Sequence, residues 1–389
     1  MTFSIVSPNL QKESSKAASA TSNGVKILFI TNSVEKGDGG GVFSQHVIEG
    51  LTKRLKAEWV LFTVVPVSAG SGIPIHLTLV GLCRTLFRLR REARECDVIH
   101  AFDVFPFGIM ATIATIGLKK KIVLTLIGSG SIIPFYQRRF SLLARLCVRR
   151  ANSVIAISRF TRDEVLTKAP GLSVEVINPG IDLEEFASVE PRFLPDAVSK
   201  MQPYLLSVGA IRWRKGYELS IRAFAEIAEE FPKLRYIIIG GRWNSLQYSE
   251  ELKSLVKELR LQERVVFLLD VTTRTELVQW YLGAELFCLF SRNTGHDVEG
   301  FGMVFIEAAA VGLPVVGVKN CGVDDAVRDG VNGILITSPE EFTQALRTIL
   351  RDKKRAQRMG EESLKWAGHF GWEEKIEEYA ELYRRLGVS

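Results

Sequence analysis

Short apolar segments that favour β-strands alternate with helical patterns along most of the chain, and this alternation restricts the fold more than any other feature. The first segment, Val25 to Thr31, leads through a glycine-rich stretch at residues 37–41 into a helical pattern from Val42 to Leu55. Further strand candidates, with helical patterns between most of them, are Trp59–Val65, Val98–Ala101, Ile122–Leu126, Val154–Ile157 and Val174–Ile177. Because such alternation is typical of parallel sheets covered on both faces, we expect an α/β, Rossmann-like domain.

A second alternating series follows a proline-containing stretch at residues 187–202. Its strand candidates are Tyr204–Val208, Tyr236–Gly240, Val265–Leu269, Leu286–Phe290, Val315–Val318 and Gly333–Ile336. A chain of 389 residues exceeds what one hydrophobic core usually supports, so we expect two domains. The predicted organisation is a disordered tail at 1–24, an N-terminal Rossmann-like domain at 25–190, a linker at 191–202, a C-terminal Rossmann-like domain at 203–370 and a C-terminal helix at 371–389.

Composition excludes several classes of protein. With 47% hydrophobic and 24% charged residues, the chain has the make-up of an ordinary soluble globular enzyme. Its five cysteines are scattered without C-x-x-C spacing, which predicts neither a disulfide framework nor a zinc site. The longest apolar run, Val104 to Leu118, is too short to span a bilayer and contains Pro106 and Gly108. The first 24 residues lack the apolar core of a signal peptide, so we expect a cytoplasmic protein without a membrane span.

Two arginine-rich stretches, at residues 82–94 and 135–150, carry much of the net charge of +6. Both mix arginines with leucines and phenylalanines, as basic amphipathic helices do. Such helices can lie on anionic membrane surfaces. They can equally pack their apolar faces on a sheet and leave the arginines in water. No recognisable nucleic-acid-binding module accompanies the charge, so nucleic acid is the less favoured partner.

A single carboxylate stands out in the second half of the chain. Glu307 is the only charged residue between Gly300 and Val318, and the apolar spacing around it indicates a buried helix. A lone carboxylate in such a helix costs several kcal/mol unless a partner compensates it. Just upstream, Gly300 and Gly302 predict a close approach of the backbone to a ligand, and the N–H groups of a helix start suit an anion. We therefore expect a phosphate pocket flanked by Glu299 and Glu307, although a core helix with a satisfied glutamate is the simpler alternative.

Several motifs in a fixed order resemble those of retaining glycosyltransferases of the GT-B fold, most closely glycosyltransferase family 4. Glu299–Glu307 resembles the family's E-x7-E element, and Ser207–Gly216 resembles the diphosphate-binding opening of its second domain. Asn178–Phe186 resembles the segment that enters the interdomain linker, and Ala151–Ser158 resembles the strand before it. Phe370–Trp372 is a weaker match to the start of the crossing helix. The resemblance implies two Rossmann-like domains that face each other across a cleft, with the C-terminal helix returning to the N-terminal domain.

The resemblance also implies roles for individual residues. Glu307 would accept hydrogen bonds from the donor ribose, and Glu299 from hydroxyls of the transferred sugar. Lys215 would neutralise the diphosphate as the leaving nucleotide departs. The diphosphate and sugar would be held by backbone groups near Gly300 and by the N–H groups of Phe301, Gly302, Met303 and Val304.

The first domain would contribute Gly40 and Gly41, which would approach the diphosphate, although an ordinary tight turn explains these glycines equally simply. No D-x-D motif is present, in keeping with a metal-independent enzyme that needs no cofactor beyond its nucleotide-sugar co-substrate.

The sequence departs from the family pattern in two places. Ala210 occupies the position of an arginine that many members carry, and Arg212 or Arg214 could supply the missing guanidinium. The family's histidine in a T-x-H-G context is replaced by Ile127, which can neither hydrogen-bond through its side chain nor carry a proton. His100, at the end of a predicted strand, is the candidate replacement on the acceptor side.

The leading hypothesis is therefore transfer of a sugar from a UDP- or GDP-sugar to a hydroxyl acceptor, saccharide or lipid-linked, in polysaccharide, lipopolysaccharide or glycolipid biosynthesis. Contact with the inner face of the membrane would run through the two basic stretches. The alternatives are a catalytically weakened homologue or partner subunit that binds nucleotide sugar, and a GT-B-like nucleotide-sugar epimerase. A nicotinamide enzyme is weakly supported, because the glycines lack G-x-G-x-x-G spacing.

Overall fold

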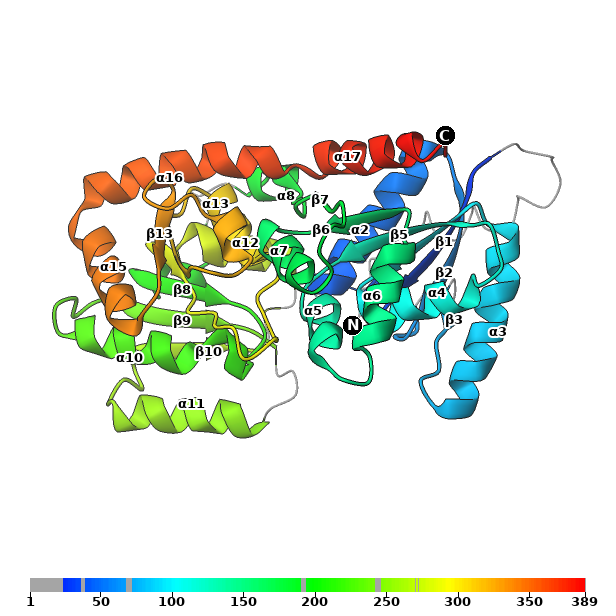
Figure 1. Cartoon of the computed structure of the whole chain (residues 1–389). Helices are drawn as coiled ribbons and strands as arrows, with labels where there is room; N and C mark the ends of the chain where they lie inside the picture. The colour runs from blue at the N-terminus through cyan, green and yellow to red at the C-terminus, as the bar shows by residue number, and fades with distance from the viewer. Residues whose placement is uncertain are drawn as a thin grey trace, which may run out of the picture. The chain divides into compact units, whose positions relative to one another are not determined.

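The computed structural model describes residues 24–35, 39–67, 72–189, 194–241, 246–269, 271 and 273–388. The predicted tail therefore lies outside the described residues except for Gly24. Two parallel-sheet, Rossmann-like assemblies make up the described chain, so the predicted α/β class is confirmed (Figure 1).

The first sheet has seven strands in the order β3-β2-β1-β4-β5-β6-β7. Their bounds are β1 (Lys26–Thr31), β2 (Glu58–Thr63), β3 (Gly72–Pro74), β4 (Val98–Phe102), β5 (Lys121–Leu126), β6 (Ser153–Ala156) and β7 (Glu175–Val176). In the central strand, Ile27 lies opposite Trp59 on one side and Val98 on the other, in parallel register. Every residue of β1 after Lys26 is buried, as expected for a strand covered on both faces.

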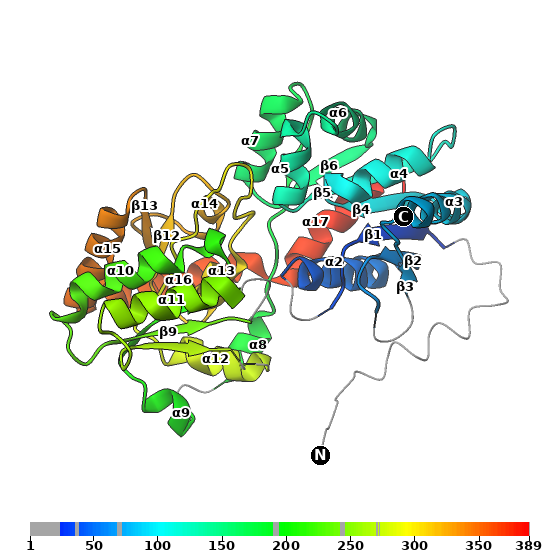
Figure 2. The same ribbon diagram turned by 90° about the horizontal axis from the view of Figure 1, so that it is seen from below.

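Helices α2 and α17 lie on one side of the central strands, and α3, α4 and α6 lie on the other (Figure 2). The helices of the first half of the chain are α2 (Gly39–Leu55), α3 (Leu79–Glu95), η1 (Val104–Gly108), α4 (Ile109–Ala114), α5 (Ser129–Tyr136), α6 (Ser141–Arg150), α7 (Arg159–Lys168), α8 (Leu183–Ala187) and α9 (Asp196–Ser199). The last of these, α9, lies within the stretch predicted as a linker.

The second sheet has six strands in the order β10-β9-β8-β11-β12-β13. Their bounds are β8 (Tyr204–Val208), β9 (Arg235–Ile239), β10 (Val265–Leu268), β11 (Leu286–Cys288), β12 (Val315–Val318) and β13 (Gly333–Ile336). The paired strands run parallel, with Leu205 opposite both Tyr236 and Leu286. Fully buried Tyr204, Tyr236 and Phe287 belong to the core of this sheet.

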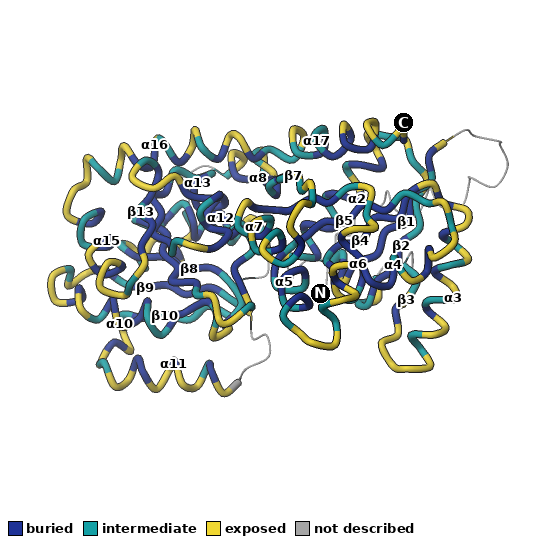
Figure 3. Tube along the Cα trace, viewed as in Figure 1, coloured by how far each residue is buried: buried dark blue, intermediate teal, exposed yellow. Residues whose placement is uncertain are grey.

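Helices α10 and α11 cover one face of the second sheet, and α12, α13 and α16 cover the other (Figure 1). The helices here are η3 (Trp213–Lys215), α10 (Tyr217–Ala228), α11 (Leu246–Glu258), α12 (Arg274–Leu282), α13 (Met303–Ala310), α14 (Val323–Ala326), α15 (Pro339–Arg351), α16 (Lys353–Ala367), η4 (Gly368–Phe370) and α17 (Trp372–Arg385). Figure 3 shows the strands buried and the outer helix faces exposed.

Two compact units can be defined from the contacts of the chain. The first comprises residues 1–125, 142–155 and 376–389, and the second comprises 126–141 and 156–375. The units are thus interleaved in sequence, whereas the predicted domains are two continuous segments. From Ile376 onward the C-terminal helix belongs to the first unit, and its Tyr379 and Tyr383 are fully buried.

Candidate functional site

The candidate site lies in the second unit, where two turns leave neighbouring strands. One turn joins β8 to α10 and carries Lys215. The other joins β11 to α13 and carries Glu299. Strands β8 and β11 are adjacent and parallel, so both turns leave the same edge of the sheet, where α/β proteins bind their ligands. The N–H of Arg292 donates to the carbonyl of Arg214 (2.9 Å) and ties the turns together.

Glu299 joins these two turns electrostatically. Its Oε2 accepts hydrogen bonds from Lys215 Nζ (2.6 Å), Arg214 Nη1 (2.9 Å) and Ser291 Oγ (3.1 Å). Burial by itself would raise the pKa of the carboxyl, but the charges and hydrogen bonds of Lys215 and Arg214 outweigh it and lower the pKa to about 2. Because a carboxylate oxygen accepts more than one hydrogen bond, this ionised, immobilised carboxylate can still accept a ligand hydroxyl.

Lys215 is buried, and it shares its carboxylate partner with Arg214. Desolvation lowers the pKa of Lys215 below its ordinary value, because one shared carboxylate does not fully compensate a buried ammonium. Two buried or half-buried cations therefore face one buried anion. The nearest further acid, Asp297, lies 3.5 Å from Arg214 Nε and is more than half exposed. With Asp297 counted the charges of the cluster balance, but both cations are more buried than Asp297, and the incomplete compensation of Lys215 favours an anionic ligand.

Of the two arginines proposed to replace the missing family guanidinium, Arg214 is the one that joins this cluster. Its pKa is raised, because the nearby Glu299 and Asp297 outweigh the effect of its burial. Arg212 is exposed, and Glu299 accepts from Lys215, Arg214 and Ser291 instead. The structure therefore favours Arg214 for this position.

The glycines of the second turn meet conformational requirements of the chain. Gly302 caps α13 with φ of +87°, a region that disfavours side chains. At Gly300, a Cβ atom would lie 2.2 Å from the carbonyl oxygen of Ile127. Helix α13 then begins at Met303, and the first N–H groups of a helix lack intrahelical acceptors. The predicted anion-binding start of a helix is present, and binding of a diphosphate by Phe301–Val304 stays a prediction.

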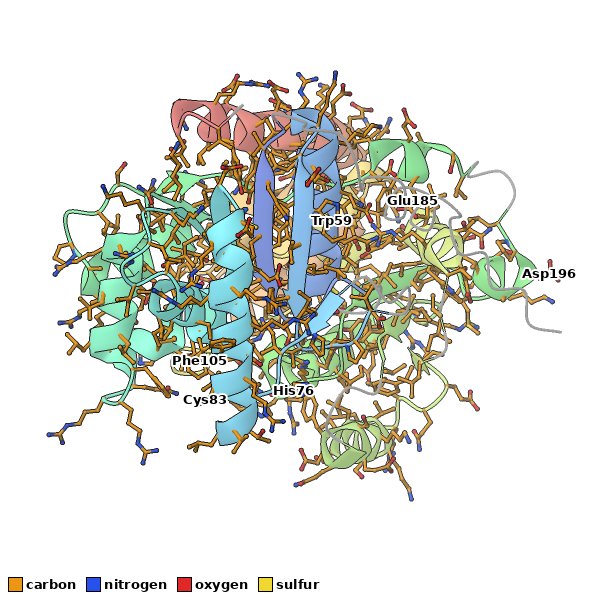
Figure 4. The ribbon with its side chains drawn as sticks, turned by 90° about the vertical axis from the view of Figure 1, so that its right-hand side faces the viewer. Trp59, His76, Cys83, Phe105, Glu185 and Asp196 are labelled. Carbon is orange, nitrogen blue, oxygen red and sulfur yellow. The ribbon has the colours of Figure 1, made fainter. Side chains whose placement is uncertain are left out.

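The buried Glu307 has the compensating partners that its apolar surroundings require. Arg274 Nη1 donates to Oε1 (2.7 Å), and the hydroxyl of fully buried Tyr281 donates to Oε2 (2.9 Å). Arg274 also donates through Nε to Glu185 on α8 (2.9 Å), a residue labelled in Figure 4. Because carboxylate oxygens accept more than one hydrogen bond, Glu307 can still bind a diol.

His100 lies in the core of the first unit, which argues against its predicted role on the acceptor side. Its ring is fully buried, stacks on Phe102 and is hydrogen-bonded to Tyr383 (2.9 Å) and Thr125 (2.8 Å). Burial lowers the pKa of His100 to about 3. Since both ring nitrogens are engaged and no face is exposed, we assign His100 a structural position.

Gly40 and Gly41 lie in the first turn of α2, and the loop residues 36–38 fall outside the described residues. A Cβ atom at Gly41 would lie 2.9 Å from the carbonyl oxygen of Glu35. Close packing of the helix start therefore explains the glycine at 41, and an approach of either glycine to a diphosphate stays a prediction. No group of three His, Cys, Asp or Glu side chains in the described chain is arranged to hold a metal.

Several contributors to the site were missed by the sequence analysis: Arg274, Tyr281, Ser291 and Glu185. Arg274 and Tyr281 lie on α12, more than twenty residues before Glu307, and nothing in their local pattern indicates which carboxylate they contact. The sequence predicted that Glu307 needs a partner. It could not identify the partner, because the pairing depends on how α12 and α13 meet.

Two family models match the chain. One, described as glycosyl transferases group 1, matches residues 194–366, and the other, glycosyltransferase family 4, matches residues 39–185. The GDP-mannose-dependent alpha-(1-6)-phosphatidylinositol monomannoside mannosyltransferase of Mycolicibacterium smegmatis is 31% identical over 62% of this chain and 65% of its own length. A D-inositol 3-phosphate glycosyltransferase of Kribbella flavida is 33% identical over 61% of this chain and 57% of its own. The matched part thus spans less than two thirds of these relatives.

Solved structures resemble the chain over nearly its whole length. Anabaena HepE, solved with UDP and glucose, superimposes with a TM-score of 0.76 at 21% identity, covering 93% of this chain and all of that one. A glycosyltransferase from Rickettsia africae gives a TM-score of 0.78 at 17% identity, covering 94% and 99%. At these identities the likeness concerns the fold.

Proposed function

Because the chain belongs to glycosyltransferase family 4, we propose that it transfers a sugar from a nucleotide diphosphate sugar to a hydroxyl acceptor, with retention at the anomeric carbon. The observation that carries the proposal is the cluster of Lys215, Arg214 and Glu299 beside the start of α13. It combines two buried or half-buried cations, helix N–H groups and an immobilised carboxylate. These are the groups that a diphosphate linked to a sugar requires.

In the proposed reaction, Lys215 and Arg214 stabilise the negative charge that develops on the departing diphosphate. The bond between the anomeric carbon and the diphosphate oxygen breaks, and the acceptor oxygen bonds to that carbon from the same face. The acceptor proton passes to the departing phosphate oxygen, so no protein base is needed. Glu299 accepts hydrogen bonds from hydroxyls of the sugar, and Glu307 accepts them from hydroxyls of the ribose. Together the two carboxylates orient the donor.

A screen of nucleotide-sugar donors tests this proposal most directly. UDP- and GDP-sugars are mixed with the protein, and binding is followed by thermal shift and turnover by nucleotide release. We expect at least one donor to stabilise the fold, by about 2.7 kcal/mol at a hundred times its Kd. Glu307→Ala should abolish the shift, whereas Leu364→Ala, at an exposed position on α16, should preserve it. Absence of binding and turnover with every donor would refute the proposal.

A catalytically weakened homologue, or a partner subunit that binds the donor, is the second candidate. The observation that favours it is the loss of the family histidine at Ile127 together with the inaccessibility of His100. Donor binding without transfer to any acceptor would support this candidate. Conversion of the donor sugar without an acceptor would instead indicate an epimerase.

The donor base and the acceptor class also belong to the proposal. The Mycolicibacterium relative is named as GDP-mannose-dependent, and the Anabaena structure contains UDP, so both nucleotides belong in the screen. We keep saccharide and lipid-linked acceptors, and a cytoplasmic location at the inner face of the membrane, as parts of the proposal. No helix in the described part of the chain has the length and apolarity of a membrane span.

Contact with the membrane surface is supported by the outer face of α3. Leu79 is 87% and Phe87 75% exposed, far more than large apolar residues usually are. Arg84, Arg88, Arg91 and Arg94 are exposed on the same helix (Figure 4 labels Cys83 on it). The inward side is occupied by Thr85, Leu89 and Ala93. Helix α3 therefore has apolar residues on both faces, which packing on the sheet alone does not explain.

Helix α6, in the second basic stretch, likewise combines exposed apolar side chains with exposed arginines. Leu142 and Leu146 are exposed, as are Arg145, Arg149 and Arg150. On α3 the exposed apolar residues begin before the predicted stretch 82–94, because Leu79 and Val80 at the N-terminal end of the helix are also exposed. An apolar surface surrounded by arginines is complementary to an anionic bilayer, into which the side chains insert while the guanidinium groups meet the headgroups.

We predict co-sedimentation with vesicles that contain anionic lipid, and release by added salt. The double variant Leu79→Ser, Phe87→Ser should lose most of this binding, because each side chain supplies about 1.5–3 kcal/mol of apolar transfer when fully buried. Leu364→Ser is the matched control, since it removes an exposed leucine from α16. Binding that ignores lipid charge, or that survives in the double variant, would contradict the prediction.

A further inference from the structure

Trp213 is exposed at the edge of the candidate site. Its side chain belongs to η3, the 3-10 turn that also contains Lys215, and it is 50% exposed although Lys215 is buried. Tryptophan presents a large apolar surface, and leaving it in water forgoes a substantial part of the hydrophobic gain. An exposed indole beside a site of proposed sugar transfer therefore calls for a physical explanation.

The indole is held in place by Arg292. The guanidinium carbon of Arg292 lies 3.3 Å from the centre of the Trp213 ring, and Arg292 Nε donates to the Trp213 carbonyl (3.3 Å). Glu218 forms an ion pair with the same guanidinium. We call Trp213, Arg292 and Glu218 the Trp213 platform. One face of the indole is covered by Arg292, so the exposure of the side chain belongs mainly to the other face.

The Trp213 platform adjoins the residues that bind the transferred sugar in the proposed function. Trp213 precedes Arg214, which donates to Glu299. Arg292 follows Ser291, whose hydroxyl also donates to Glu299. Glu307, the proposed ribose ligand, makes its contacts to α12 instead. Along the chain, the Trp213 platform is therefore adjacent to the residues that hold Glu299 rather than to those that hold Glu307.

We propose that the open face of Trp213 is a binding subsite for a pyranose ring of the acceptor. The C–H groups on one face of a pyranose form an apolar surface that matches a flat aromatic ring, while its hydroxyls remain at the edge for polar partners. Because Arg292 fixes the indole before binding, little side-chain entropy remains to be lost. This inference rests on the proposed glycosyl transfer and names a part of its acceptor site.

The kinetic test compares Trp213→Ala, Trp213→Phe and Leu364→Ala, with methyl α- and β-D-pyranosides as acceptors and the donor found in the screen. Trp213→Ala should raise the acceptor KM about tenfold or more, which corresponds to about 1.4 kcal/mol. Trp213→Phe should retain most of the affinity because it keeps an aromatic face. Nucleotide release without acceptor and the donor KM should stay within about twofold of the unaltered protein, because the donor contacts remain.

Either of two results would refute the proposal that Trp213 forms an acceptor subsite. One is an acceptor KM unchanged in Trp213→Ala. The other is a loss of donor affinity as large as the loss of acceptor affinity, which would place the indole on the donor. If no donor turns over, the proposed function fails separately, and saturation-transfer NMR with the same methyl pyranosides still decides the subsite. We then expect ring-proton saturation that disappears in Trp213→Ala, and its absence from the unaltered protein would refute the inference.

Discussion

Glu299 and Glu307 are both buried carboxylates, and each is held by cationic and hydroxyl side chains. Lys215, Arg214 and Ser291 donate hydrogen bonds to Glu299, whereas Arg274 and Tyr281 donate hydrogen bonds to Glu307. Fixed partners hold both side chains in one orientation before a ligand arrives, which reduces the reorganisation that binding requires.

Buried His100 gives a pH dependence that can be measured at the residue scale. Its pKa is about 3 in the folded chain and about 6.5 when unfolded, so the folded state binds fewer protons below pH 6.5. The stability it contributes is complete above pH 6.5 and is lost as the pH falls from there towards 3. Between pH 7 and pH 5 the loss should be roughly 2 kcal/mol.

The measurement is urea unfolding of the unaltered protein and of His100→Gln at pH 7 and pH 5. The other groups titrate in both proteins, so the difference between the two pH dependences isolates His100. Its ring contacts are Phe29, Phe102, Tyr379 and Tyr383, none of them charged at these pH values. Equal pH dependence in the two proteins would show that His100 is protonated, or accessible, in the fold.

At the scale of elements, the turn that begins α10 depends on Gly216. Its φ is +60°, and a Cβ atom there would lie 2.0 Å from the carbonyl oxygen of Phe290, which precedes Ser291. Gly330 offers a matched control, because its φ is +75° and no atom lies within 4 Å of its hypothetical Cβ. Gly330→Ala should cost about 1 kcal/mol of unfolding free energy, and Gly216→Ala clearly more, because backbone must also shift.

The same pair of variants separates stability from donor binding. Gly216 follows Lys215 directly, so a displaced turn moves the ammonium away from Glu299, and nucleotide affinity should fall in Gly216→Ala and remain in Gly330→Ala. Chemical denaturation and calorimetric titration with the nucleotide found in the screen measure the two effects. Equal losses of stability in both variants would mean that the close approach to Phe290 is not a constraint.

Elements with a continuous apolar run could be predicted from the sequence, and those without one could not. Tyr204–Val208 was predicted with its observed bounds, because all five residues are buried and the strand is central. Strand β3 was missed, since Gly72–Pro74 has three residues, ends in proline and carries little apolar pattern. The sequence pattern around Phe87 is compatible both with packing on the sheet and with contact with a membrane surface. Only the fold shows that Phe87 lies on the exposed face of α3.

At the scale of the whole molecule, the C-terminal segment and the donor site belong to different units. Ile376, Tyr379 and Tyr383 are buried in the first unit, whereas Lys215, Glu299 and Glu307 lie in the second. The sequence predicted a returning C-terminal helix by resemblance. It could not predict that residues 126–141 join the second unit, because the boundary depends on contacts between segments distant in sequence.

We therefore expect the two units to respond separately to two perturbations. Tyr383→Ala removes a fully buried aromatic ring and a hydrogen bond to His100, and should destabilise the first unit by about 3–5 kcal/mol. Nucleotide binding should stabilise the second unit through Lys215 and Glu307. Hydrogen exchange read by mass spectrometry should show faster exchange in β1 and β4 for Tyr383→Ala, and slower exchange in β8 and β11 with nucleotide.

The matched control is Glu381→Ala, on the exposed side of α17, which should leave both patterns unchanged. The nucleotide affinity of Tyr383→Ala, measured below its unfolding transition, should equal that of the unaltered protein, because Lys215, Glu299 and Glu307 all lie in the second unit. If Tyr383→Ala accelerates exchange equally in β1 and β8, the chain unfolds as one cooperative body. The two units would then differ in their contacts but would not unfold with separate stabilities.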